Sequence, residues 1–170
     1  MYGGWLSWMR HSKLWIDLLL FHKELPVPDT INSSFETLVL AQVKLLEAGL
    51  PLDAFDACFS ASGVMFANDV LFATGAQEGR RKQEPFISAA TSIRGVITDL
   101  KIHAATEVCV FRNRSSFDTV DGATHQIDGL CWQKWINGKI SEERYYDGIL
   151  MDKLIANGIL SAPEEFAPSG

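Results

Sequence analysis

Apolar side chains at helical spacing begin at about residue 33 and predict a helix whose buried face holds Phe35, Leu38, Val39, Val43 and Leu46. Ser33 followed by Glu36 has the form of a capping box, in which the two side chains serve the free backbone amides at a helix start. Gly49 suits the end of this helix, and Pro51 prevents its continuation. A short second helix is predicted over residues 52–59.

The pattern then changes to runs of β-branched and aromatic residues. Residues 64–72 predict a strand, or a bent hairpin around Asn68 and Asp69. Residues 75–83 are polar, contain two glycines and predict a turn region, and Pro85 is suited to the first turn of a helix ending near residue 93.

Long alternating segments follow and predict a meander of antiparallel strands over residues 99–104, 107–114, 123–135 and 139–147. Asp121-Gly122 and Asn137-Gly138 are typical of tight hairpin turns between such strands. Residues 149–160 predict a terminal helix, and residues 161–170 a loose tail. Helices that precede an antiparallel sheet indicate an α+β fold for residues 31–160.

Residues 1–30 have a separate character, with three tryptophans and an amphipathic helical pattern over residues 5–25 that ends at Pro26 and Pro28. The longest apolar run, residues 18–21, is too short to span a bilayer, and Asp17 interrupts the apolar region that a signal peptide needs. We expect this helix to pack on the domain or on a partner subunit. Contact with a membrane surface is less favoured, because the helix has few cations.

Composition narrows the function classes. The 170 residues are 47% hydrophobic and 21% charged, which is typical of one globular domain, and the net charge of −6 disfavours nucleic-acid binding. Cys58, Cys109 and Cys131 match no metal spacing, and an odd number of cysteines without a signal peptide predicts a cytoplasmic protein. No P-loop, dinucleotide fingerprint, catalytic triad or metal-ligand pattern occurs, so we expect neither a cofactor nor a metal.

The segment from Trp135 to Asp147, with Asn-Gly-Lys-Ile at its turn and an aromatic strand that ends at an Asp, resembles the closing hairpin of SnoaL-like proteins of the NTF2-like superfamily. The region from Phe59 to Phe72 also resembles the strand that follows the second helix there. The resemblance covers residues 33–155 and implies a cone-shaped, curved mixed or antiparallel sheet, packed against N-terminal helices around a central pocket.

That superfamily includes polyketide cyclases, steroid isomerases, dehydratases and epoxide hydrolases, and also members that only bind ligands or partners. Asp69 lies close to the position of the general-base carboxylate in steroid isomerase-like members. Asp128 resembles their second, protonated carboxyl group. A turn-capping role for Asp69 and a solvated position for Asp128 are the alternatives, and strand parity decides the second.

Four further residues are candidates for acid–base chemistry. His125 titrates near neutrality, although a lone histidine is more often structural. Arg112 matches the arginine of epoxide hydrolase-like members, but Arg114 stands where their aspartate is expected. Tyr145 and Asp147 share one face of the last strand, and a slip of one residue would exchange that face for the other.

These features favour a cofactor-independent isomerase, cyclase, dehydratase or epoxide hydrolase that acts on a small hydrophobic metabolite. The alternative is a module that binds a ligand or assembles with a partner and performs no chemistry. A homodimer is expected, because a partner commonly covers the open face of such a sheet.

Overall fold

The computed structural model describes residues 34–167, and the expected N-terminal helix of residues 1–30 lies outside them. The helices are α1 (Phe35–Glu47), α2 (Pro51–Cys58), α3 (Ala76–Ser88) and α4 (Gly148–Ala156), with 3-10 turns η1 (Ala104–Thr106) and η2 (Pro163–Phe166). The strands are β1 (Phe59–Ala67), β2 (Val70–Thr74), β3 (Ala90–Arg94), β4 (Ile97–His103), β5 (Val108–Asn113), β6 (Ser116–Thr119), β7 (Thr124–Gln126), β8 (Gly129–Ile136) and β9 (Lys139–Asp147).

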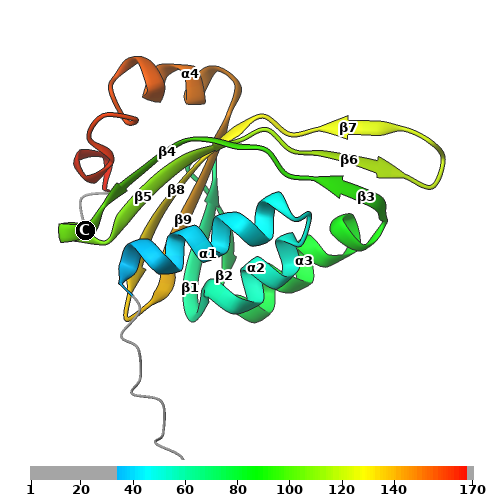
Figure 1. The fold of residues 1–170 in the computed structure, drawn as a ribbon, viewed down its shortest axis with the longest axis horizontal. Coiled ribbons are helices and arrows are strands. Elements are labelled where there is room, and N and C mark those ends of the chain that lie inside the picture. The colour runs from blue at the N-terminus through cyan, green and yellow to red at the C-terminus, as the bar shows by residue number, and fades with distance from the viewer. Residues whose placement is uncertain (1–33, 168–170) are drawn as a thin grey trace, which may run out of the picture. The chain divides into compact units, whose positions relative to one another are not determined.

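A curved six-stranded sheet forms the centre of the fold (Figure 1). Its strand order is β2-β1-β9-β8-β5-β4, and only β1 and β9 run parallel. A smaller sheet of β3, β6 and β7 extends from one end. Helices α1, α2 and α3 cover one face of the large sheet, which we call the inner face, and α4 lies on the outer face. The α+β cone expected from the sequence is confirmed.

The start of α1 differs from prediction by one residue. Ser34, not Ser33, is the N-cap, and its hydroxyl accepts a hydrogen bond from the Thr37 amide at 3.3 Å. Gly49 adopts a φ of 76° just after the helix, as its predicted role at the helix end requires.

The predicted turn over residues 75–83 is wrong, because these residues form most of α3. Salt bridges one helical turn apart stabilise the polar stretch, between Arg80 and Glu84 at 3.1 Å and between Lys82 and Glu78 at 2.9 Å. Gly79 permits close packing, since a Cβ there would lie 2.9 Å from the ring of Phe55. Helix α3 therefore contains Pro85 in its interior and ends at Ser88, where the next helix was expected to continue to residue 93.

The long strand predicted over residues 123–135 is also divided. Thr124–Gln126 pairs with β6 in the small sheet, whereas Gly129–Ile136 pairs with β5 and β9 in the large one. Residues 127 and 128 lie between the two strands. The predicted hairpins at Asp121-Gly122 and Asn137-Gly138 are confirmed, the latter with φ values of 52° and 73°.

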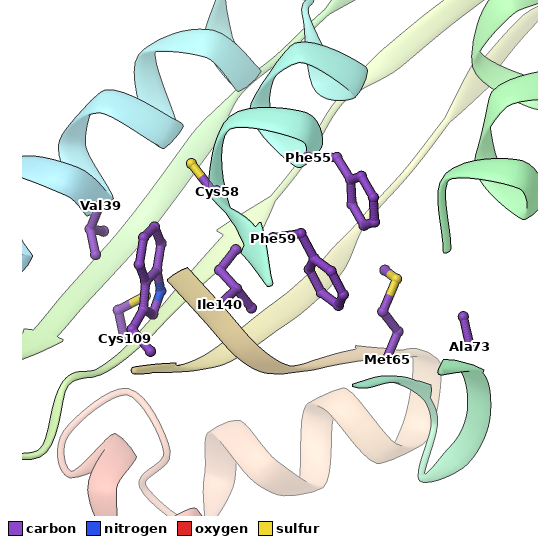
Figure 2. Packing of buried hydrophobic residues seen from close by; sticks show 9 residues of the cluster. Val39, Phe55, Cys58, Phe59, Met65, Ala73, Cys109 and Ile140 are labelled. Atoms are coloured by element: carbon purple, nitrogen blue, oxygen red, sulfur yellow. The ribbon is translucent and has the colours of Figure 1, made fainter. Parts of the chain in front are cut away.

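Two apolar clusters fix the sheet between its covering layers. The inner cluster joins α1 and α2 to the sheet through residues that include Val39, Phe55, Phe59 and Ile140 (Figure 2). The outer cluster packs α4 and the C-terminal segment against Val108, Val110, Leu130 and Trp132.

Residues 163–166, which were predicted to belong to a loose tail, form η2 and pack against the outer cluster. Pro163 is buried in η2, and its carbonyl accepts a 2.8 Å hydrogen bond from the Trp132 indole nitrogen. The chain's own α4 and η2 thus cover part of the face for which a partner subunit was expected. Within residues 34–167, no helix is long and apolar enough to cross a membrane.

Candidate functional site

A cavity of about 300 Å³ lies between the inner face of the large sheet and helices α1, α2 and α3. Its walls are mainly aromatic and aliphatic. The aromatic part consists of Phe55, Phe66, Phe72, Phe86, Phe111, Phe117 and Tyr145. A cavity of this size and apolarity is suited to a small organic molecule.

Glu143 supplies the cavity's carboxyl group. It is half-buried on β9, directly beside Met65 of β1 and Gln133 of β8. A bulge at Ser141 shifts the alternation of β9, so that Ile140, Glu143 and Tyr145 all line the cavity. Burial raises the pKa of Glu143, although the hydrogen bond from Gln133 acts in the opposite direction.

The amide of Gln133 is fully buried and held from two sides. Its oxygen accepts hydrogen bonds from the Trp135 indole at 3.1 Å and from the Cys109 thiol at 3.4 Å. Its nitrogen donates to Glu143 Oε2 at 2.7 Å. Because an indole N–H can only donate, Trp135 fixes the orientation of the amide and so directs a donor at the carboxyl group.

Tyr145 lies two residues beyond Glu143, opposite Cys131. Burial raises its pKa to about 12, so its hydroxyl stays protonated at neutral pH and can donate. Its ring lies over Gly129, where a Cβ would come within 2.2 Å of the phenol. Gly129 thus provides the space that Tyr145 occupies.

Neutral polar groups complete the lining. Ser115 donates a hydrogen bond to Asn113, and both residues border the cavity. On the helix side, Gln42 is only 4% exposed, and its Oε1 has no hydrogen-bond partner among the residues described.

Of the six residues that the sequence nominated, the structure places Tyr145 in the cavity wall. Asp69 lies outside it, in the β1–β2 turn with φ of 64°, where it accepts hydrogen bonds from Arg144 and Tyr146 at 3.0 Å. Asp147 is exposed at the end of β9, and it accepts a 2.7 Å hydrogen bond from the Asn68 side chain.

Arg112 and Asp128 form an ion pair with one another rather than lining the cavity, with nitrogen–oxygen distances of 2.7 and 2.8 Å. The Arg112 guanidinium lowers the pKa of Asp128, which is opposite to the raised pKa that a pocket acid would need. His125 is exposed on β7, where its ring stacks on Phe117. None of these three side chains is among the residues that line the cavity with Glu143.

The sequence reasoning missed Glu143 itself. Strand alternation carried a usable signal, because Glu143 stands two residues before Tyr145 and shares its face. Glu142 and Glu143 are adjacent near the start of the strand, however, and in sequence either one can be a solvated position. Tertiary contacts distinguish Glu143: Gln133 pairs with it across the sheet, and helices α1, α2 and α3 close the cavity around it.

No family model matches the chain, and no curated protein shows significant sequence similarity to it. Solved structures match by fold. A candidate SnoaL-like polyketide cyclase from Mesorhizobium loti is 16% identical with a TM-score of 0.54, over 66% of this chain and 97% of that one. An NTF2-like protein of unknown function from Burkholderia pseudomallei is 11% identical with a TM-score of 0.55, over 72% and 96%.

A third match is TerC, which was co-crystallised with polyporic acid. It is 11% identical with a TM-score of 0.54, over 73% of this chain and 99% of that one. Identities this low show the fold alone. Together with the helix-covered curved sheet and its cavity, these matches show that the chain has the NTF2-like fold of SnoaL-like proteins.

Proposed function

We propose that the protein is a cofactor-independent acid–base enzyme that acts on a small apolar molecule, with Glu143 as the group that accepts and returns a proton. One observation carries the proposal: a carboxyl group lines an apolar cavity, and a fixed amide holds it there. A carboxyl group whose pKa is raised by burial is suited to proton transfer near neutral pH. This role replaces the one expected for Asp69 and Asp128.

Glu143 and Tyr145, both on β9, are suited to different roles in such a reaction. The Glu143 carboxylate would take a proton from a substrate carbon, and the Tyr145 hydroxyl would donate a hydrogen bond to the oxygen on which negative charge develops. Two residues along a strand separate the groups by about 7 Å between backbone positions. Gln133 stabilises the carboxylate form and holds its orientation.

A substrate-independent assay tests this proposal. 5-Nitrobenzisoxazole opens to a coloured phenolate when a base removes its carbon-bound proton, and it is a small aromatic compound suited to this cavity. We expect the wild-type protein to accelerate the opening and Glu143→Gln to lose about 100-fold or more of that acceleration. Absorbance at the phenolate band gives the rate.

Asp69→Asn and Asp128→Asn are the matched controls, because both remove a carboxylate outside the cavity. They should retain the wild-type rate. Equal rates for wild type and Glu143→Gln, or a loss confined to Asp69→Asn or Asp128→Asn, would contradict the role of Glu143.

The alternative is a ligand-binding module without chemistry. The observation in its favour is that five of the six nominated side chains lie outside the cavity wall. If that reading is correct, 5-nitrobenzisoxazole opens no faster with the protein than with a small carboxylate in solution, while apolar ligands still bind.

A further inference from the structure

The side chains that line the cavity include an acid but no base. Among residues 34–167, the lining contains no Lys, Arg or His, and Glu143 is its only Asp or Glu. The nearest basic side chain along the strand, Arg144, pairs with Asp69 and Glu142 and lies over the ring of Phe66 at 4.3 Å. Lys139 donates instead to the Ala57 carbonyl. Glu143 therefore has no cation beside it.

The helix ends that border the cavity do not offset the negative charge of a Glu143 carboxylate. The first turn of α2 borders the cavity at Pro51, which has no amide proton to offer an anion. The last turn of α3 borders it at Phe86 and Ile87, and the carbonyl end of a helix favours cations. The two contributions oppose one another, and the carboxylate remains the dominant charge.

The aromatic walls add to the preference, apart from Phe66 and Phe72, whose rings already contact Arg144 and Lys82. Faces of aromatic rings attract cations, most strongly where water is displaced. An anionic ligand would meet the Glu143 carboxylate in an apolar environment, where like charges repel strongly and neither is solvated. A protonated amine would give the carboxylate the partner that the protein does not supply.

We propose that the cavity selects its ligand by charge: it takes a small apolar molecule that carries a basic nitrogen, with the ammonium or N–H group against Glu143, and it excludes organic anions. The inference rests on the proposed function only in using the same carboxyl group. It names the substrate class, and it holds for binding even where no reaction follows.

Three ligands with one ring system separate charge from shape: 2-aminoindane, 2-indanol and indane-2-carboxylate. We expect isothermal calorimetry at pH 7 to give tightest binding for the amine, and binding at least tenfold weaker for the carboxylate. With Glu143→Gln the advantage of the amine over the alcohol should disappear. Asp128→Asn removes an acid of the Arg112 pair and should keep the wild-type order.

The order of the three ligands on the wild-type protein tests the proposal without any variant. Equal or tighter binding of the carboxylate overturns it, as does an amine preference that persists in Glu143→Gln, or no binding of any of the three. Proton abstraction from 5-nitrobenzisoxazole is measured separately. Charge selection without that activity contradicts only the proposed function, and the activity without charge selection contradicts only this inference.

Discussion

A carboxyl group in an apolar cavity, such as Glu143, makes stability depend on pH in the direction opposite to that of a paired surface acid. Its pKa is raised from 4.5 in the folded state, so the folded protein holds the proton more tightly than the unfolded chain. The free energy of unfolding therefore falls as pH rises above 4.5, through the window in which the unfolded chain ionises first.

Substitution of Glu143 by Gln removes this dependence. We expect Glu143→Gln and wild type to have similar stability near pH 4.5, and the variant to become the more stable as pH rises above 4.5. Denaturant unfolding followed by tryptophan fluorescence at several pH values measures the difference.

Asp128→Asn should change the pH dependence of stability in the opposite direction. Arg112 lowers the pKa of Asp128, so that carboxylate contributes stability above pH 3.8 that is lost as pH falls. The Asn variant should be less stable than wild type at pH 7. A Glu143→Gln variant that loses stability at pH 8 relative to wild type would contradict the assignment of Glu143 as an acid without a cationic partner.

At the scale of elements, the contact between β8 and β9 sets the position of Tyr145. Gly129 faces Asp147 in the register, yet the Tyr145 phenol lies within 2.2 Å of where a Gly129 side chain would begin. We expect Gly129→Ala to displace the ring and to lower the free energy of unfolding by about 1–3 kcal/mol, as overpacking commonly does. Chemical denaturation measures it.

A double-mutant cycle isolates that contact. In a Tyr145→Ala background the obstructing ring is gone, so Gly129→Ala should cost much less there than in wild type. Equal costs in the two backgrounds would mean that the ring does not occupy the space over Gly129.

Local sequence patterns were sufficient to predict the Asn137-Gly138 turn and the end of α1. Asn137-Gly138 adopts the positive φ values that its residue types favour, and Gly49 ends α1 for the same reason. Such positions depend on the backbone preferences of one or two residues. The polar run over residues 76–84 lacks that local guidance: it became helical because ion pairs one turn apart and the packing of Gly79 on Phe55 favour it.

At the scale of the whole molecule, the C-terminal segment covers the outer face of the sheet. Trp132 is 1% exposed beneath it, and its indole N–H has the Pro163 carbonyl as partner. Deletion of residues 162–170 would leave that donor without its partner and expose the apolar cluster around it. We expect a loss of about 2 kcal/mol or more in the free energy of unfolding.

The matched control is deletion of residues 168–170, which leaves η2 intact, so the difference between the two deletions measures the contribution of η2. The uncovered face of the longer deletion should also promote self-association, which sedimentation velocity detects. A deletion of residues 162–170 as stable as the full chain would show that η2 does not contribute to the outer cluster.

The sequence by itself determined the first two helices, the tight hairpins and the α+β class, because helical spacing, alternation and turn chemistry act over a few neighbouring residues. Only the tertiary structure decided which acid lines the cavity. The bulge at Ser141 and the break at residues 127–128 reset strand parity, so Asp128 went to Arg112 outside the cavity. Glu143 became the cavity acid through neighbours brought together from β1, β8 and β9, and such neighbours are set by packing across the sheet.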